Sequence, residues 1–275
     1  MNKIIGLINA WAAEDWIEPA IQQALLYCDE VIVSVGAHST DFKYLEDSTL
    51  QRVTKYQDKI KIVSMSKAGL SHNDIKANTL NRMLKQSSLF KQDNWIWILD
   101  VDEFYFNATH LKIKEIIKNN IHDCIRIEAK LFYINGFRYL CSSHDRLFKI
   151  TNSACCFKPT QHWTGSQNKK FILKRDNHRL GMFHYCLLTG LKYKELLWES
   201  HLGRHDEKIL WLREIYIKYD LNNEDLWINK NLKISGIKSP FYNNQFQPDQ
   251  NGYLFVYMES HPSFINHLMQ KEDFR

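Results

Sequence analysis

The sequence predicts an α/β fold in which a mainly parallel β-sheet carries helices on both faces. Four short apolar runs have the length and composition of buried strands, at residues 3–9, 30–35, 60–65 and 95–100. Helical patterns separate these runs, near residues 14–27, 41–56 and 71–88. Because strands that alternate with helices form β-α-β units, the first hundred residues should build a parallel sheet.

The second half predicts a smaller section of mixed or antiparallel strands. A helical pattern near residues 109–119 is followed by five short apolar runs, at residues 124–134, 137–141, 146–150, 170–174 and 182–187. Residues 191–219 favour a helix, and the remainder is irregular and rich in aromatic residues. No change of composition marks a domain boundary, so residues 1–275 are predicted to form a single domain.

The composition is that of a globular protein with a sizeable core, since 44% of the 275 residues are hydrophobic and 24% are charged. The apolar runs are far shorter than the ~20 residues that a membrane span needs, so no transmembrane segment is expected. Residues 1–12 have features of a short signal peptide, but a first strand explains them better. The six cysteines show neither metal-ligand spacing nor a regular framework, which favours reduced thiols in a cytoplasmic protein.

The charge is distributed unevenly along the chain. Residues 1–137 carry 16 basic and 17 acidic side chains, a net charge of −1, whereas residues 138–275 carry 20 and 14, a net charge of +6. Residues 138–179 alone hold nine basic side chains against Asp145 and Asp176. This excess is either a solvated face or a surface that meets an anionic partner such as phosphate, nucleic acid or a membrane.

The stretch NWIWILDVDEFYFN, residues 94–107, places three acids directly after a predicted buried strand. Carboxylates rarely stay buried unless they are paired or bind a cation. In parallel sheets, ligands bind beyond the carboxyl ends of the strands, which is where Asp100, Asp102 and Glu103 fall. Two carboxylates one residue apart can share a divalent cation, and their hard oxygen atoms suit Mg²⁺ or Mn²⁺ together with phosphate oxygens.

Four short motifs occur in an informative order along the chain. They are EDWIEPAIQQALLYCDEVIVSVGAHSTD at residues 14–41, LDVDEFY at 99–105, DRLFK at 145–149 and MFHYC at 182–186. The second resembles the D-x-D region of GT-A glycosyltransferases of the family-2-like group. The others resemble that group's first helix with its Ser-Thr-Asp turn, its Arg-Leu-Phe strand and its later His-Tyr element. The resemblance covers roughly residues 3–220 and implies a Rossmann-like GT-A fold.

The resemblance implies roles for individual residues. Asp102 would be the principal ligand of Mn²⁺ or Mg²⁺, His184 a further ligand, and Asp100 a contact to the ribose or to the metal. Trp11, Asp41 and Lys76 would line the nucleotide pocket by stacking, polar contact and diphosphate pairing respectively.

The resemblance also divides the chain by role. Residues 1–107 would form the half that binds the nucleotide sugar, for which UDP is favoured, and residues 108–220 the acceptor side. Residues 221–275 form an extension that matches no motif. An inverting transferase also needs a base for the acceptor hydroxyl, and the candidates are His162, Glu103 and Asp145.

The basic stretch favours an anionic acceptor. Arg146, Trp163, Lys169 and Lys170 combine cationic and aromatic side chains that suit phosphates and stacking. The acceptor would be a surface glycan or its lipid carrier, which would bring a cytoplasmic protein to the membrane, or a hydroxymethylated pyrimidine flipped out of DNA.

Other interpretations stay open from the residues alone. Asp100 and Asp102 can cap a turn, Trp11 and His184 can be core residues, and Lys76 can be a surface residue. The alternatives to a glycosyltransferase are a non-catalytic binding protein on a decayed transferase fold and another metal-dependent nucleotide enzyme.

Overall fold

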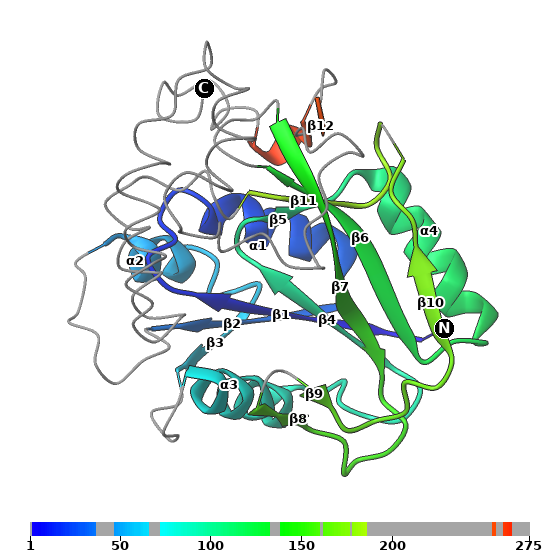
Figure 1. Ribbon diagram of the computed structural model, residues 1–275. Helices are drawn as coiled ribbons and strands as arrows, with labels where there is room; N and C mark the ends of the chain where they lie inside the picture. The colour runs from blue at the N-terminus through cyan, green and yellow to red at the C-terminus, as the bar shows by residue number, and fades with distance from the viewer. Residues whose placement is uncertain are drawn as a thin grey trace, which may run out of the picture.

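The computed structural model describes residues 2–36, 47–65, 72–132, 138–159, 162–176, 178–185, 255–256 and 261–265. Within these residues the strands form a ten-stranded mixed sheet and a separate two-stranded sheet (Figure 1). The main path of the large sheet runs in the order β3-β2-β1-β4-β7-β6-β11-β5. Strands from both halves of the chain therefore belong to one sheet.

The first hundred residues fold as the alternating pattern predicts. The observed elements are β1 (Ile4–Ala10), α1 (Ile17–Tyr27), β2 (Glu30–Val35), α2 (Thr49–Thr54), β3 (Lys61–Ser64), α3 (His72–Gln86) and β4 (Trp95–Asp100). Strands β1 to β4 pair in parallel. The α/β class with a parallel first half is therefore confirmed. The first part of the predicted helix at residues 41–56 lies outside the described residues, as does the predicted helix at 191–219.

The second half contains the predicted mixture of parallel and antiparallel strands. Its elements are β5 (Glu103–Phe104), α4 (Asn107–Asn119), β6 (Cys124–Phe132), β7 (Arg138–Lys149), β8 (Phe157–Lys158), β9 (His162–Trp163), β10 (Lys170–Leu173), β11 (Met182–His184), β12 (Phe255–Val256) and a 3-10 turn η4 (Ser263–Ile265). The prediction of two strands at residues 137–141 and 146–150 is wrong, because β7 is continuous. Strands β5, β8, β9 and β12 were not predicted.

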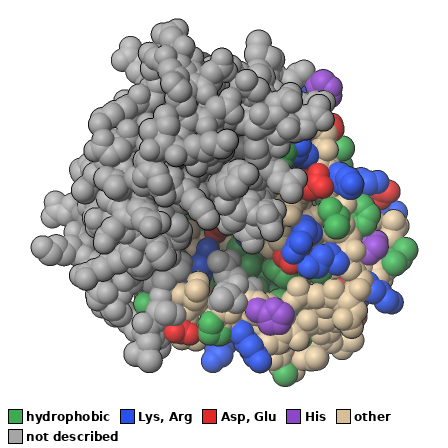
Figure 2. Space-filling model, viewed as in Figure 1, with side chains coloured by type: hydrophobic (Ala, Val, Ile, Leu, Met, Phe, Trp, Pro, Cys, Tyr) green, Lys and Arg blue, Asp and Glu red, His purple; other side chains and the backbone are tan. Residues whose placement is uncertain are grey.

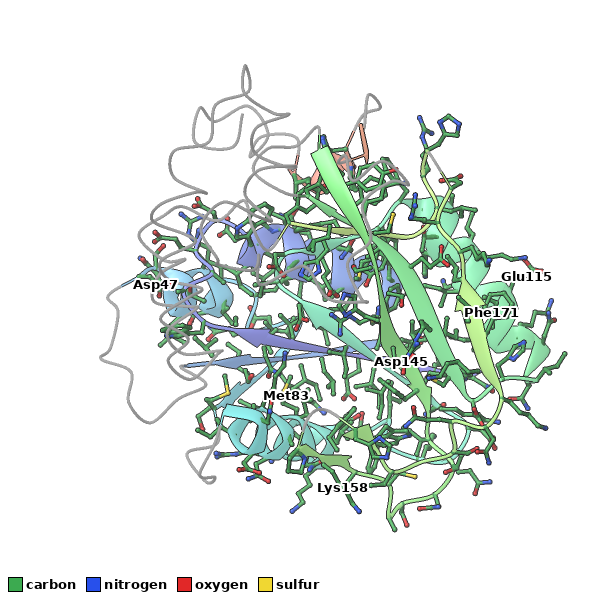
Figure 3. All side chains as sticks on the ribbon, viewed as in Figure 1. Asp47, Met83, Glu115, Asp145, Lys158 and Phe171 are labelled. Atoms are coloured by element: carbon green, nitrogen blue, oxygen red, sulfur yellow. The ribbon has the colours of Figure 1, made fainter. Side chains whose placement is uncertain are left out.

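Two hydrophobic layers enclose the sheet. Ile8, Val33 and Trp97 pack with residues of α1 and α4 on one face. Leu7 and Ile98 pack with residues of α3 on the other face, where Met83 points toward the sheet in Figure 3. Each central strand alternates between the two layers, so it is apolar along most of its length, as expected for a strand covered on both faces.

The strand order places a topological switch point between β1 and β4. The chain moves outward from β1 to β2 and β3, and then returns to add β4 on the other side of β1. Connections before and after such a point leave on opposite sides, and ligands bind in the crevice beyond the carboxyl ends of the two strands. Asn9 near the end of β1 pairs with Asp100 at the end of β4, so both residues border this crevice.

Strand β7 contains a β-bulge next to the crevice. The antiparallel pairing of β4 and β7 runs from Trp95–Lys149 to Trp97–Leu147. On its other side, β7 shifts register against β6 between Ile125 and Arg126, which leaves Arg146 as the extra residue. A bulge bends a strand and redirects a side chain. Here it turns Arg146 into the space beside the carboxyl end of β4.

Candidate active site

The pairing register of the strands brings polar side chains to the carboxyl edge of β2, β1 and β4. Ser34 and Asn9 are paired in register, and the Ser34 hydroxyl donates to the Asn9 amide oxygen at 2.5 Å. Trp11 follows β1 directly at the same edge and is partly buried. The predicted pocket residues Trp11 and Asp100 therefore share one edge, whereas Asp41 lies outside the described residues.

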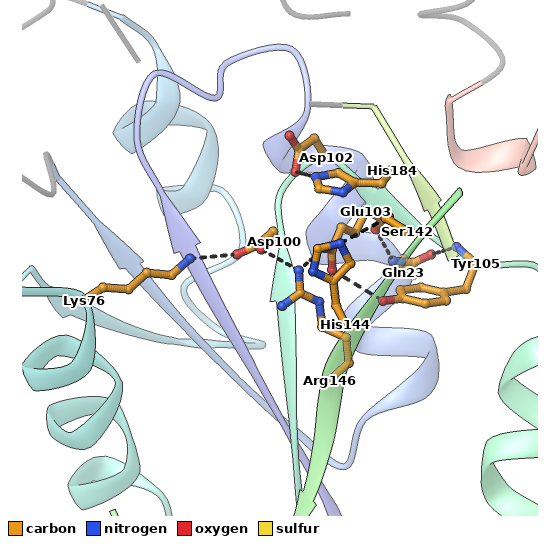
Figure 4. Close-up of polar contacts among 10 residues, drawn as sticks. All are labelled: Gln23, Lys76, Asp100, Asp102, Glu103, Tyr105, Ser142, His144, Arg146 and His184. Atoms are coloured by element: carbon orange, nitrogen blue, oxygen red, sulfur yellow. Dashed lines mark hydrogen bonds and ion pairs between the residues drawn. The ribbon is translucent and has the colours of Figure 1, made fainter. Parts of the chain in front are cut away.

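Asp100 joins two cationic side chains from opposite sides. Lys76 of α3 donates to one carboxylate oxygen at 3.3 Å, and Arg146 of β7 donates to the other at 2.9 Å (Figure 4). Burial acts to raise the pKa of Asp100, but the positive charges of Lys76 and Arg146 outweigh it and hold the pKa well below its ordinary value. Lys76 is only 7% exposed, so it is a residue of the crevice and not of the surface.

Glu103 is completely buried beside Asp100 and Arg146. It forms an ion pair with Arg146, and its other oxygen accepts a hydrogen bond from the Tyr105 hydroxyl at 3.4 Å. The Gln23 amide fixes the backbone here, because it donates to the Glu103 carbonyl at 3.0 Å and accepts from the Tyr105 N–H at 2.7 Å. Glu103 therefore anchors the acidic turn. Its engaged, buried carboxylate is unsuited to the predicted role of base.

Asp102 projects toward His184. The Asp102 carboxylate lies 3.6 Å from the Nε2 atom of His184, and both side chains are less than 20% exposed. Strand β11 fixes this pair, because His184 lies opposite Glu103 and the Tyr185 N–H donates to the Asp102 carbonyl at 2.8 Å. Burial and the neighbouring charge of Asp100 raise the pKa of Asp102, although His184 opposes them.

Asp102 and His184 supply an oxygen and a nitrogen atom that fit a divalent cation. These two atoms would fill only part of its coordination shell. Two ligands that are each about 2.1 Å from a cation lie roughly 3 Å apart at a right angle and farther apart at wider angles. The observed 3.6 Å separation is compatible with that geometry. Within the described part of the chain, no group of three or more His, Cys, Asp or Glu side chains is arranged to hold a metal. Mg²⁺ and Mn²⁺ sites commonly take one or two protein ligands and complete their shell with water and phosphate.

Strand β7 contributes two site residues that the sequence analysis missed. The ring of His144 packs edge-on against His184, with 5.7 Å between their centroids, and Nε2 of His144 lies 3.3 Å from the Ser142 hydroxyl. Burial and the positive charge of Arg146 lower the pKa of His144 to about 2, so its imidazole is neutral at physiological pH. The signal was the two-residue spacing of Ser142 and His144, which places both on one face of a strand.

The structure does not bring His162 and Trp163 to the acidic turn. The ring of Trp163 is fully buried among core residues, and its indole N–H donates to the Lys149 carbonyl at 3.3 Å. Lys149 pairs with Trp95, the first residue of β4, whereas Asp100 is the last. At about 3.3 Å per residue, the two ends are roughly 17 Å apart. Trp163 is a core residue and unavailable for stacking.

Lys169 and Lys170 also lie far from His184. Lys170 pairs with Cys124 at the start of β6, and His184 pairs with Leu131 seven residues later, which is roughly 23 Å along the strand. Arg146 is the one predicted acceptor residue that reaches the turn, and it is bound there by acids. The basic stretch is spread over β7 and β10, which run in opposite directions, and Lys170 is paired with Asp145. Figure 2 shows acidic and apolar side chains among the basic ones on this face.

Asp145 belongs to a separate ion-pair group. Its carboxylate accepts two hydrogen bonds from Arg126, at 2.8 and 3.0 Å, and one from Lys170 at 2.9 Å. It pairs in register with Arg126, and strand alternation places it on the face opposite His144. Both cations lower the pKa of Asp145 despite its partial burial. The predicted base role therefore has no support from its position.

The fold and site together define an α/β protein with a crevice at a topological switch point and an acidic turn beside a histidine. No protein-family model matches the chain, and no curated protein matches it. Two solved structures of TarS from S. aureus are similar to it. One, TarS 1-349, is 16% identical over 82% of this chain and 78% of that chain, with a TM-score of 0.43. The other is 14% identical over 82% of this chain and 47% of that chain, with a TM-score of 0.44. Likeness at this level concerns the fold alone, and the site is assigned from its own geometry.

Proposed function

We propose that the protein is a metal-dependent glycosyltransferase that transfers a sugar from a nucleotide-sugar donor to a hydroxyl acceptor. The observation that carries the proposal is the Asp102–His184 pair at a switch-point crevice, with Lys76 and Arg146 beside it. The motif order from residue 14 to residue 186 supports the GT-A form of this function.

The charges of the crevice favour a diphosphate only together with a cation. Asp100, Asp102 and Glu103 carry three negative charges, and Lys76 and Arg146 carry two positive charges, so the net charge of these five side chains is 2 − 3 = −1. A divalent cation changes this sum to +1. Such an ion would neutralise charge that develops on the departing diphosphate.

Residues of this chain would hold the donor in a defined orientation. Asp102 and His184 would hold the cation, and Lys76, which Asp100 fixes at the crevice wall, would meet the diphosphate. The nucleoside would lie along the ends of β1 and β4 beside Trp11. Mn²⁺ is the favoured ion, because imidazole nitrogen is a poorer ligand for the harder Mg²⁺. UDP is the favoured nucleotide on the resemblance.

No base is assigned among His162, Glu103 and Asp145. His162 lies on the hairpin of β8 and β9 near the amino end of β4, and the two acids are engaged in ion pairs. His144 borders the site, but a pKa of about 2 makes it a weak base at physiological pH. We propose that its neutral imidazole offers a hydrogen bond to the bound donor or acceptor.

A panel of nucleotide sugars tests the function directly. The protein is incubated with each donor and Mn²⁺, and release of nucleoside diphosphate is measured. We expect release from one donor class, with loss of activity in excess EDTA and in Asp102→Asn. Activity that persists in EDTA would contradict the metal assignment. If no donor reacts but nucleotides bind, the alternative of a binding protein on a transferase fold is favoured.

Anionic glycans and DNA containing hydroxymethylated pyrimidine are the acceptors to test. If Lys169→Glu with Lys170→Glu leaves use of either acceptor unchanged, these lysines are solvated surface. Binding of DNA that does not weaken with salt would argue against phosphate contacts.

A further inference from the structure

A short piece of the unmatched extension packs behind the candidate metal site. Strand β12 pairs antiparallel with the start of β7, and η4 follows close by (Figure 1). Ile265 is completely buried in an aromatic cluster with Trp16, Phe104, Phe132 and Tyr185. The extension therefore contributes to the hydrophobic core beside β11.

Tyr185 connects this cluster to the site. It follows His184 directly, and its N–H donates to the Asp102 carbonyl at 2.8 Å. Its ring is fully buried and stacks on Phe132, with 4.8 Å between centroids and an angle of 5°. One residue thus links the two proposed metal ligands through the backbone, and its ring determines where that backbone lies.

His261 fixes the other end of Tyr185. The Tyr185 hydroxyl and the Nδ1 atom of His261 are 2.7 Å apart, although 76 residues separate them in sequence. The His261 ring also packs edge-on against Phe132 at 5.1 Å. A buried tyrosine hydroxyl needs a polar partner, so loss of this contact favours rotation or displacement of Tyr185.

Strand β11 lies between β6 and β5 and pairs with both. Its three residues pair with Ala129–Leu131 of β6, whereas its pairing with β5 consists of two residue pairs, Phe183–Phe104 and His184–Glu103. The short contact between β11 and β5 sets the distance between His184 and the turn that carries Asp102. Because Tyr185 packs directly beside this contact, the position of His184 relative to Asp102 is sensitive to the packing of Tyr185.

We propose that His261 is a positioning residue of the metal site, which acts through Tyr185 to hold Asp102 and His184 at the separation a divalent cation requires. This inference rests on the proposed function, since it assumes that these two residues bind Mn²⁺. The C-terminal extension then contributes a residue, His261, that orients the two metal ligands, although it lies far from both of them in sequence.

The test is Mn²⁺ binding by the full chain, measured from the electron paramagnetic resonance signal of free Mn²⁺. We expect His261→Ala and Tyr185→Phe each to weaken binding about tenfold, as loss of residues that orient metal ligands commonly does. The double variant should be no weaker than either single variant, because both remove one contact. His261→Asn, which retains a polar atom near the position of Nδ1, should recover most of the affinity.

His110→Ala is the matched control. His110 is also a buried histidine against a tyrosine, since its ring stacks on Tyr27 at 4.1 Å, but it packs with Tyr27 and Trp97 in the layer that contains α1 and α4, apart from the aromatic cluster around Tyr185. We expect it to lower the melting temperature and leave Mn²⁺ affinity unchanged.

The outcomes separate the two proposals. Wild-type affinity in folded Tyr185→Phe and His261→Ala, with binding lost in Asp102→Asn, would overturn the positioning role alone. Equal weakening in His110→Ala would also overturn it, because general destabilisation would then explain the effect. Absence of Mn²⁺ binding by the wild-type protein would overturn both the metal site and the positioning role.

Discussion

At the scale of single residues, the central feature is the different environment of three acids within four positions. Asp100 is held by two cations, Glu103 is buried against Arg146, and Asp102 faces His184. The position of Asp100 and Asp102 at a strand's carboxyl end could be predicted, because an apolar strand precedes them. The Arg146 contacts could not, since they depend on an extra residue in β7 against β6, which the apolar pattern of the sequence does not mark.

Arg146→Met should destabilise the fold strongly. The substitution leaves Glu103 buried without its cation, and breaking a buried ion pair from one side costs about 3–5 kcal/mol. Arg126→Met is the matched control, because its partner Asp145 is more exposed and retains Lys170. Its cost should be about 1 kcal/mol or less. Urea unfolding measures both, and equal costs would contradict the assigned role of Arg146.

Asp102→Asn should stabilise the metal-free protein while it abolishes Mn²⁺ binding. The pKa of Asp102 is raised in the folded state, mainly by burial, so its charged form opposes folding. This cost is absent at a pH below the ordinary carboxyl range, appears as the pH rises, and is fully present above the raised pKa. The gain at neutral pH should be roughly 0.5–2 kcal/mol, the usual size for a stabilising substitution.

Unfolding in EDTA at neutral and at strongly acidic pH checks this prediction. The stabilisation should vanish at the acidic pH, where both residues are uncharged. A variant that is less stable than the wild type at neutral pH would show that the Asp102 charge supports the fold.

At the scale of elements, the buried strands of the sheet are the elements that the sequence predicts most accurately. Strand β4 lies at the predicted residues 95–100, because its run of Trp, Ile and Leu has no polar interruption. Strand β7 was split in the prediction because Ser142 to Arg146 are polar. Those residues are polar because part of this strand faces the crevice and part forms surface ion pairs. They interrupt the apolar pattern that would otherwise predict one continuous strand.

Gln23→Leu should loosen the attachment of β5 to α1. The Gln23 amide forms two buried hydrogen bonds to the backbone of Glu103 and Tyr105, and unsatisfied buried groups cost about 1–3 kcal/mol each. The neighbouring Gln22 bonds to the Tyr56 hydroxyl at the exposed surface, so Gln22→Leu should change stability by about 0.5 kcal/mol or less. Thermal unfolding of both variants makes the comparison. Similar losses would mean that the β5 contacts contribute little.

At the scale of the whole molecule, the topology explains where the site lies. The order β3-β2-β1-β4 creates the switch point. The antiparallel pairing of β7 with β4 brings Arg146 to it, and the antiparallel pairing of β11 with β5 brings His184 to it. The alternation of strands and helices in the sequence predicts the parallel first half of the sheet. The position of His184 depends on short strands, β5 and β11, whose two or three residues carry no periodic signal in the sequence. Within the described residues, no helix is long and apolar enough to cross a membrane.

The most direct measurement of the central claim is the calorimetric titration of UDP, and of other nucleoside diphosphates, with and without Mn²⁺. The −1 charge of the crevice predicts binding by the wild-type protein in Mn²⁺ and none in EDTA. Asp102→Asn should bind in neither condition, and Lys76→Met should bind more weakly in Mn²⁺ with its metal affinity unchanged. Equal nucleotide binding in EDTA and in Mn²⁺, or full binding by Asp102→Asn, would contradict a metal-dependent nucleotide site at this edge of the sheet.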